Sequence, residues 1–170
     1  MYPDFEELLA ELNAAGAKYL IGGAHALALH ARPRATKDLD IYIGPTRPNA
    51  ARVVRAISKF FGGTAPTYVT IDNLLDPKIF IQLGVAPVRV DFLPALFTTT
   101  FAAAWRRRVR ARFASVPANF LSRDDLVAEK RWFARAQDLA DVEQLERAAR
   151  ASSTNVRRSR PRKTAKRRRA

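Results

Sequence analysis

The chain has 170 residues, 48% of them hydrophobic, so it can bury one core but is too short for two full-sized domains. It contains no cysteine, which excludes a disulfide framework and any zinc site that needs thiolates. No apolar run approaches the roughly 20 residues of a membrane-spanning helix, and the acidic, periodic start MYPDFEELL is unlike a signal peptide. We therefore expect a soluble, cytoplasmic protein whose metal ligands are carboxylates or histidines.

The formal net charge of +14 is concentrated at the C-terminus. Residues 151–170 contain nine Lys or Arg and no acid, and removing these nine charges leaves +5 for residues 1–150. This basic tail has too few apolar side chains to offset the entropy cost of ordering it, so we expect one domain over 1–150 and a disordered tail over 151–170. The tail predicts attraction to nucleic acid, either in a specific role or as loose, salt-sensitive binding that also adds solubility.

Apolar periodicity predicts alternating helices and strands in the first third of the chain. The expected elements are a helix over 4–15, a strand over 18–21, a helix over 24–31, a strand over 38–43 and a helix from Pro48 to the glycines at 62–63. The strand over 38–43 alternates acidic or polar with apolar residues, which places Asp38, Asp40 and Tyr42 on one face.

The second half predicts two more strands and a helical end. The expected elements are strands over 78–83 and 88–93, a helix over 123–133 that opens with a capping box at Ser122 and Asp125, and a helix over 137–150. The alternation over 108–113 favours a strand, although its composition also permits a helix. The whole order predicts a mixed α/β or α+β domain, in which helices flank a mixed sheet.

Three acids form the candidate catalytic site. Carboxylates at positions i and i+2 of a strand point the same way, so Asp38 and Asp40 repel each other unless a cation lies between them. Mg²⁺, or Mn²⁺ in its place, suits such oxygen ligands and commonly bridges carboxylates to phosphates. Asp91 is flanked by apolar residues in its strand and qualifies as a third ligand. Three carboxylates can hold two metals about 4 Å apart, an arrangement suited to nucleotidyl transfer.

A glycine turn precedes this strand. Gly22 and Gly23 stand between a predicted strand and a helix, where backbone N–H groups can approach a phosphate, although such a pair is also typical of a plain tight turn. Arg34 and Thr36 lie just before Asp38 and either position a phosphate or brace the strand. We interpret Trp105 and Trp132 as core residues.

The stretch YLIGGAHALALHARPRATKDLDIYI resembles the polymerase-beta-like nucleotidyltransferase superfamily, especially its small bacterial AbiEii-like members. The hallmark of that superfamily is a strand, a Gly-Gly or Gly-Ser turn, an Asp-x-Asp on the next strand and a later third Asp. Gly22, Gly23, Asp38, Asp40 and Asp91 match these positions, and the resemblance covers roughly residues 17–145.

The resemblance continues in LSRDDLVAEKRWFARAQDLADVEQL, where Lys130, Arg135, Asp138 and Asp141 match a recurring lysine and Arg-x-x-Asp-x-x-Asp. It implies a nucleotidyltransferase fold, magnesium, a nucleoside triphosphate donor contacted by Lys130 and, in some members, a toxin that nucleotidylates transfer RNA and is masked by an antitoxin. Asp138 and Asp141 either line the cleft or form surface ion pairs.

One position departs from the family pattern. Many catalytic members carry serine in the second half of the turn, whereas this chain has Ala24 after the two glycines. The leading hypothesis is an enzyme that moves a nucleoside monophosphate from a triphosphate to an acceptor hydroxyl and releases pyrophosphate. The alternative is a protein that keeps the fold without the activity and binds nucleic acid through its basic tail.

Overall fold

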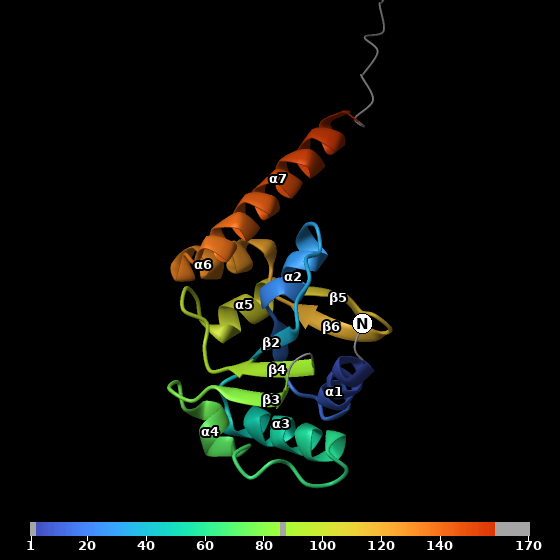
Figure 1. The fold of residues 1–170 in the computed structure, drawn as a ribbon, viewed down its shortest axis with the longest axis vertical. Helices are drawn as coiled ribbons and strands as arrows, with labels where there is room; N and C mark the ends of the chain where they lie inside the picture. Colours follow the sequence, from blue (N-terminus) through green and yellow to red (C-terminus); the bar gives the residue numbers. More distant parts are fainter. Residues whose placement is uncertain (1–2, 86–87, 159–170) are drawn as a thin grey trace, which may run out of the picture.

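The computed structural model describes residues 3–85 and 88–158, with side chains up to residue 151, and is built on one six-stranded mixed sheet (Figure 1). The spatial order of the strands is β3-β4-β2-β1-β6-β5. Their bounds are β1 (Tyr19–Ile21), β2 (Asp38–Ile43), β3 (Ile81–Val85), β4 (Val88–Leu93), β5 (Val109–Phe113) and β6 (Val116–Phe120). The predicted mixed sheet flanked by helices is confirmed.

The pairing of the central strands decides where the acids lie. Strand β2 pairs with β4 in parallel and with β1 in antiparallel orientation, while β1 also pairs with β6 in parallel. In the β2–β4 register Asp38 lies opposite Arg89 and Asp40 lies opposite Asp91. Because partners in register share a face of the sheet, this pairing brings acids from distant parts of the sequence side by side.

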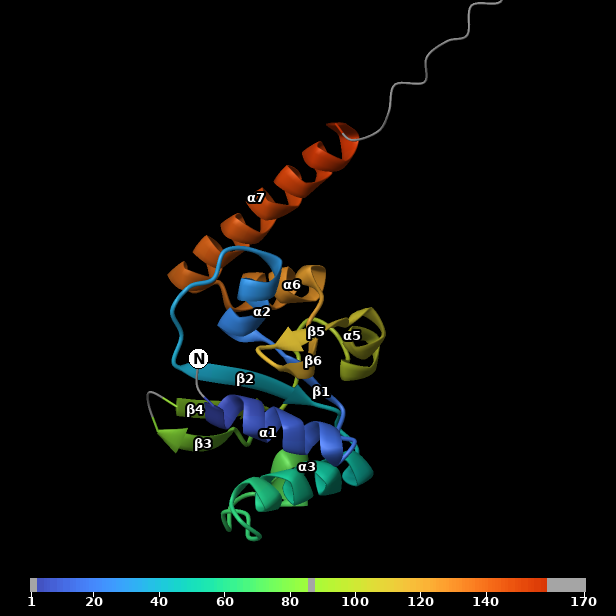
Figure 2. The same ribbon diagram turned by 90° about the vertical axis from the view of Figure 1, so that its right-hand side faces the viewer.

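Seven helices surround the sheet in the described part of the chain. They are α1 (Pro3–Ala14), α2 (Gly23–His30), α3 (Arg47–Phe60), α4 (Ile71–Leu75), α5 (Phe101–Arg107), α6 (Arg123–Phe133) and α7 (Ala136–Arg158). Helices α1 and α3 lie against each other on one side, whereas α2, α6 and α7 contact one another on the opposite side (Figure 2). The C-terminal part of α7 extends away from the rest of the molecule (Figures 1 and 2).

The core forms where the apolar stripes of the helices meet the sheet. Helix α1 buries Phe5, Leu8, Leu9 and Leu12, which follow the i, i+3, i+4, i+7 spacing of one helix face. Strand β1 is buried over its whole length because it lies in the middle of the sheet. Burial of apolar surface is the main favourable term in folding, so the shortest strand lies in the best-shielded place.

The structure corrects several element predictions. The strand expected over 78–83 runs over Ile81–Val85, and the stretch 108–113 is strand from Val109. Helix α4, helix α5 and strand β6 were not predicted. Strand β6 contains Pro117, a residue that disfavours strand interiors, and a tight turn with φ +47° at Ala114 joins it to β5.

The C-terminal boundary also differs from the prediction. Helix α7 continues to Arg158, beyond the expected domain end at residue 150, so residues 151–158 are helical rather than disordered. The predicted disorder of 159–170 falls outside the described residues and stays a prediction. Within the described ranges, no helix combines the length and apolar character needed to cross a membrane.

Replacing Leu20 by Ala should strongly destabilise the fold, because its side chain is fully buried in the central strand β1. A leucine-to-alanine change in a core typically costs about 2–5 kcal/mol. Val85→Ala is the matched control, since Val85 ends a strand but is 78% exposed, and it should change stability by no more than about 0.5 kcal/mol. Urea unfolding measures both, and equal midpoints would contradict the assigned core.

Candidate active site

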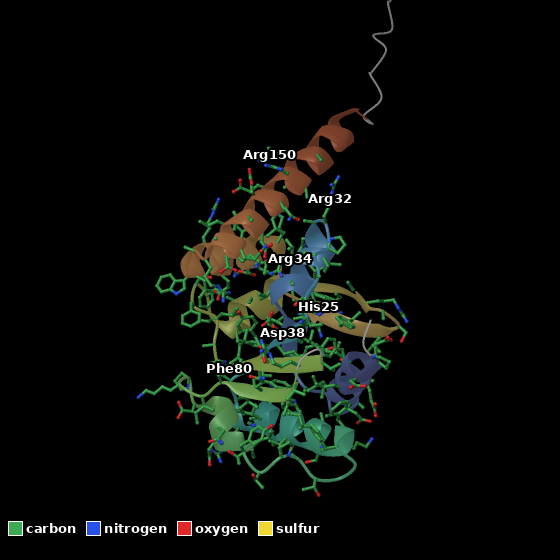
Figure 3. The ribbon with its side chains drawn as sticks, in the orientation of Figure 1. His25, Arg32, Arg34, Asp38, Phe80 and Arg150 are labelled. Atoms are coloured by element: carbon green, nitrogen blue, oxygen red, sulfur yellow. The ribbon has the colours of Figure 1, made fainter. Side chains whose placement is uncertain are left out.

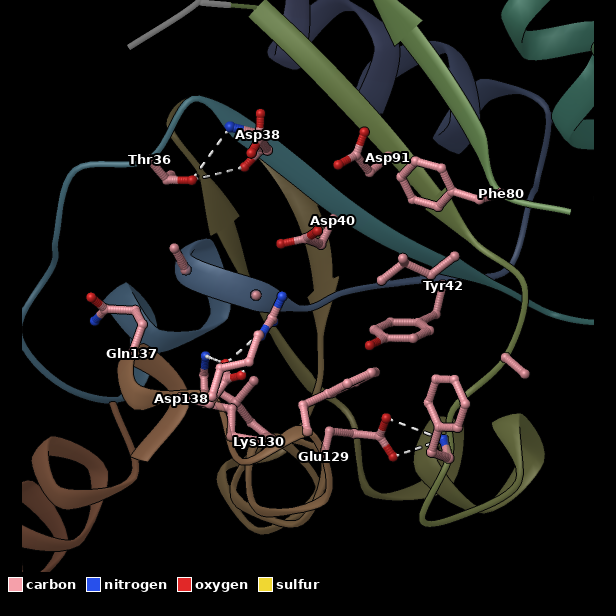
Figure 4. A pocket seen from close by; sticks show the side chains of 18 of the residues that line it. Thr36, Asp38, Asp40, Tyr42, Phe80, Asp91, Glu129, Lys130, Gln137 and Asp138 are labelled. Carbon is pink, nitrogen blue, oxygen red and sulfur yellow. Dashed lines mark hydrogen bonds and ion pairs between the residues drawn. The ribbon is translucent and has the colours of Figure 1, made fainter. Parts of the chain in front are cut away.

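A cavity of about 530 Å³ opens between the central strands and the C-terminal helices (Figure 4). Strands β2 and β4 form its floor, the start of α2 forms one wall, and α6 with the start of α7 forms the other. The cavity contains six of the seven predicted site residues: Gly23, Arg34, Asp38, Asp40, Asp91 and Lys130. The seventh, Gly22, immediately precedes α2, and its N–H donates to the Asp40 backbone oxygen at 2.9 Å.

Asp40 lies in the middle of the acidic group. Burial is the main cause that raises the pKa of its carboxyl to about 6, and the nearby carboxylates of Asp91 and Asp38 raise it further. Lys130 and Arg89 act in the opposite direction. Asp40 therefore ionises at a higher pH than an ordinary aspartate, and a cation placed beside it would favour the ionised form.

Asp91 is the most buried of the three acids, with 5% of its surface exposed. Burial raises its pKa, and Arg89 partly opposes that rise. Its Oδ1 is buried without a hydrogen-bond partner, whereas its Oδ2 lies 3.1 Å from the Arg89 guanidinium. A buried carboxylate oxygen without a partner is costly, which makes Oδ1 a candidate ligand atom for a cation.

Asp38 also contacts Arg89, so that Arg89 forms ion pairs with both Asp38 and Asp91. Its Oδ2 lies 2.7 Å from the same Arg89 nitrogen that contacts Asp91. The hydroxyl of Thr36 accepts a bond from the Asp38 backbone N–H at 3.3 Å, so Thr36 braces the start of β2 (Figure 4). Of the two roles considered for Thr36, phosphate positioning and bracing of the strand, this contact supports bracing.

The glycine turn is fitted to Asp40. Gly23 has φ +53°, and a β-carbon there would lie 1.7 Å from Asp40 Oδ2. A β-carbon at Gly22 would lie 2.7 Å from the Tyr42 ring. The turn therefore needs glycines, because the side chains of β2 lie directly against the backbone of the turn. Its predicted phosphate contact stays a prediction.

Lys130 and Arg34 reach the cavity from different elements and meet at α7. Lys130 Nζ lies 2.6 Å from Asp141 Oδ2 and 3.4 Å from Asp138 Oδ1, and all three side chains are buried. Arg34 Nε lies 3.1 Å from Asp141 Oδ1, and Arg135 Nε lies 2.6 Å from Asp138 Oδ2. The α7 acids thus form a buried ion-pair network rather than surface pairs. The donor contact predicted for Lys130 and Arg34 is not tested by this arrangement.

The pKa values of the two α7 acids follow from these contacts. Burial alone would raise the pKa of Asp138 and of Asp141, but the bonds from Arg135 and Lys130 to Asp138 lower it overall. Bonds from Arg34, Lys130 and Gln137 do the same for Asp141. Both carboxylates are accordingly held in the charged form, which keeps the network intact near neutral pH.

Glu129 is a buried site residue that the sequence interpretation missed. Its carboxylate accepts from the backbone N–H groups of Phe97 and Thr98 at 3.0 and 2.7 Å, and from the Thr98 hydroxyl at 2.6 Å. Glu129 therefore fixes the loop that closes one side of the cavity (Figure 4). In the sequence, a glutamate on α6 one residue before Lys130 looks the same as an exposed glutamate on the surface of a helix.

Three exposed aromatic side chains, Phe80, Phe97 and Phe133, line the cavity, and Trp132 lies beside Phe97. Phe97 lies almost parallel to Trp132 at a centroid distance of 6.3 Å and edge-on to Phe133 at 5.0 Å. Trp132 is 63% exposed, so the interpretation of Trp132 as a core residue is wrong. Phe80 lies just before β3 (Figure 3), and its ring lies beside Asp91 in the cavity (Figure 4). We call Phe80, Phe97, Trp132 and Phe133 the aromatic rim.

The three predicted metal ligands share one face of the sheet but are not arranged as a coordination site, so the metal site stays a prediction. Within the part of the chain that the structure describes, no three His, Cys, Asp or Glu side chains are arranged to hold a metal ion. The oxygen ligands, the unpartnered Asp91 Oδ1 and the raised pKa of Asp40 nevertheless fit a hard divalent cation. The Arg89 guanidinium now lies between two of these ligands.

Gly23→Ala should destabilise the protein more than Gly16→Ala, although both glycines have positive φ. The backbone strain alone costs roughly 1–2 kcal/mol, and a β-carbon at Gly16 meets no atom within 4 Å. At Gly23 it meets the Asp40 carboxylate, which should add roughly 1–3 kcal/mol. In an Asp40→Ala background this extra cost in urea unfolding should vanish, and its persistence would refute the assigned contact.

Asp40→Asn should stabilise the metal-free protein at pH 7. Because the folded pKa of about 6 lies above the unfolded value of 3.8, the folded wild type binds more protons between these pH values, and its stability falls as pH rises through that window. The variant removes this loss, so it should exceed the wild type by about 1–3 kcal/mol at pH 7 and converge with it near pH 4.

Urea unfolding in EDTA from pH 4 to pH 8 measures this difference. Asp72→Asn is the control, since Asp72 is an exposed acid whose side chain is 79% accessible, and it should follow the wild-type curve. Parallel curves for Asp40→Asn and the wild type would show that the carboxyl carries no burial cost.

Comparison with known proteins places the fold in a known class. No family model matches the sequence, and no curated protein matches it. The similar solved structures include ANT(2″)-Ia in complex with adenylyl-2″-tobramycin, with a TM-score of 0.59, 15% identity and coverage of 91% of this chain and 92% of that chain. They also include the solution structure of the antibiotic-resistance factor ANT(2″)-Ia, with a TM-score of 0.55, 13% identity and 92% coverage of both chains. The chain thus has a nucleotidyltransferase fold.

Proposed function

We propose that this protein is a metal-dependent nucleotidyltransferase that moves a nucleoside monophosphate from a nucleoside triphosphate to an acceptor hydroxyl and releases pyrophosphate. One observation carries the proposal: the parallel register of β2 and β4 sets Asp40 beside Asp91, with Asp38 two residues away, on the floor of a cavity closed by the glycine turn. Acids on one buried sheet face suit the binding of divalent cations, which would balance the negative charge of a transferring phosphoryl group.

Asp38, Asp40 and Asp91 would hold the metal, Mg²⁺ or Mn²⁺. When bound, the ion supplies Lewis-acid stabilisation of the phosphoryl oxygens. Asp91 would accept the proton of the attacking hydroxyl, since burial raises its pKa and its Oδ1 has no hydrogen-bond partner. The bonds at Thr36 and Gly22 hold β2 against the turn and so orient Asp38 and Asp40.

The donor phosphates would meet the backbone of the turn and the basic side chains of the cavity. Helix α2 begins at Gly23, so its first N–H groups are available to an anion at the cavity wall. Arg34 and Lys130 add positive charge there, held in place by Asp141. The methyl group of Ala24, which also lines the cavity, leaves recognition to backbone and basic groups instead of a hydroxyl.

RNA is the acceptor that the cavity favours. The Glu129 and Asp138 carboxylates are already engaged by backbone N–H groups and by Lys130 and Arg135, so outside the three proposed metal ligands they offer no free negative charge to a polycationic acceptor. The exposed aromatic rim instead offers flat apolar surface on which unpaired bases can stack. The toxin role and the antitoxin partner are extensions of this proposal that rest on the family resemblance.

The second candidate is a non-catalytic nucleic-acid-binding protein with the same fold. Arg89 between the carboxylates, Ala24 in the turn and the basic tail favour it. It requires RNA binding that is independent of metal and is lost, with its salt dependence, when the tail is removed. Catalysis instead requires the three acids.

Incubation of the protein with each labelled nucleoside triphosphate, Mg²⁺ or Mn²⁺, and total RNA, tobramycin or protein in parallel should transfer label to RNA. Asp91→Asn should reduce the rate by roughly 10²–10⁴-fold. Asp40→Asn should abolish transfer while stabilising the fold, so the loss cannot be unfolding.

Asp72→Asn is the exposed control and should keep full activity. Transfer that survives in an Asp38→Ala/Asp40→Ala double variant would refute the site. Label on tobramycin or protein in place of RNA would overturn the acceptor assignment alone.

A further inference from the structure

Arg89 occupies a special place among the carboxylates. It lies on β4, two residues before Asp91 and opposite Asp38 on β2, so its side chain shares the acidic face of the sheet. One of its terminal nitrogens lies 2.7 Å from Asp38 Oδ2 and 3.1 Å from Asp91 Oδ2. A single cationic nitrogen thus bridges two of the three predicted metal ligands.

The bridge is not fully hydrogen-bonded. Arg89 Nε is buried without a hydrogen-bond partner, and so is Asp91 Oδ1. A guanidinium has five N–H donors in a fixed fork, and it is most strongly held when paired groups satisfy that fork. Arg89 contacts its acids through one corner of the fork, and about a third of its side chain remains exposed to the cavity. The contact therefore balances charge but can be exchanged.

The other basic side chains of the cavity are engaged elsewhere. Lys130 and Arg34 contact Asp141, and Arg135 contacts Asp138. Among the lining residues that the structure describes, Arg89 is thus the cation in direct contact with the acids of the sheet. Removing it without replacement would leave adjacent carboxylates on a largely buried face without a counter-charge, which is strongly unfavourable.

We propose that Arg89 is the resident counter-ion of the carboxylate site, and that a divalent cation binds only by displacing its guanidinium from Asp38 and Asp91. This inference rests on the metal-dependent function proposed above and adds to it a residue that sets the metal affinity. Arg89 keeps the acids together in the metal-free protein, and the cost of its displacement weakens the binding of the ion. The residue is a positioning group and does not act on the substrate.

Arg89→Gln should bind Mn²⁺ at least about tenfold more tightly than the wild type, because the ion no longer has to break charged hydrogen bonds. Titration of Mn²⁺ into the metal-free protein, followed by electron paramagnetic resonance, measures the affinity without any turnover. The thermal midpoint of the variant should fall in EDTA and recover with Mn²⁺, whereas the wild type should respond much less to the metal.

Two further variants separate metal competition from a general loss of stability. Arg107→Gln breaks an ion pair with a single buried acid. Arg107 lies 2.5 Å from Asp125, whose side chain is 7% exposed, as is that of Asp91. This variant should lower the thermal midpoint with no recovery in Mn²⁺ and no change in affinity. Arg89→Lys keeps the charge but not the planar fork, and its Mn²⁺ affinity should lie between those of the wild type and Arg89→Gln.

An unchanged or weaker Mn²⁺ affinity in Arg89→Gln would overturn the proposal, as would a loss of stability that Mn²⁺ does not restore. Should Arg89→Gln fail to fold, an Arg89→Lys affinity equal to that of the wild type would overturn it as well. Tighter Mn²⁺ binding without label transfer to any acceptor would uphold the role of Arg89 and refute the proposed enzyme, so the two failures are distinguishable.

Discussion

Negative charges placed side by side on a buried face of a sheet have to be balanced by positive charges. Much of the structure around the cavity serves to place those positive charges. The parallel pairing of β2 with β4 creates the problem by setting Asp40 against Asp91. Arg89 balances part of the charge through its bridge to Asp38 and Asp91, while burial and the two neighbouring carboxylates raise the pKa of Asp40. A group of buried acids with too few cations in contact with it favours the binding of a further cation.

A second charge cluster fastens the C-terminal helices to the sheet domain. Asp141 is completely buried. Its carboxylate accepts hydrogen bonds from Lys130 on α6, from Arg34 in the segment before β2 and from Gln137 on its own helix. Burying an ion pair contributes little net stability, but removing one partner is costly, so such a network specifies one arrangement of its elements. The wall of the cavity therefore has a fixed position relative to the acids on the floor.

The sequence predicted those features that depend on spacing along the chain. Asp38 and Asp40 had to share a face because strand side chains alternate, and the glycine turn and the capping box at Ser122 are local signals. The Arg89 bridge could not be predicted, because it depends on the register between strands 50 residues apart in the chain. The exposure of Trp132 was missed for a related reason: a large apolar residue on a helix indicates burial unless its neighbours in space are known.

Helix α7 lines the cavity at one end and projects from the molecule at the other. Its first turns carry Gln137 and Asp138 into the wall of the cavity, while its 23 residues reach about 35 Å at the rise of an α-helix. The far end stands clear of the remaining helices (Figure 2). Asp138 and Asp141, which contact Lys130, lie near the start of this same helix. The direction in which the far end projects is therefore set by the ion pairs of the cavity wall.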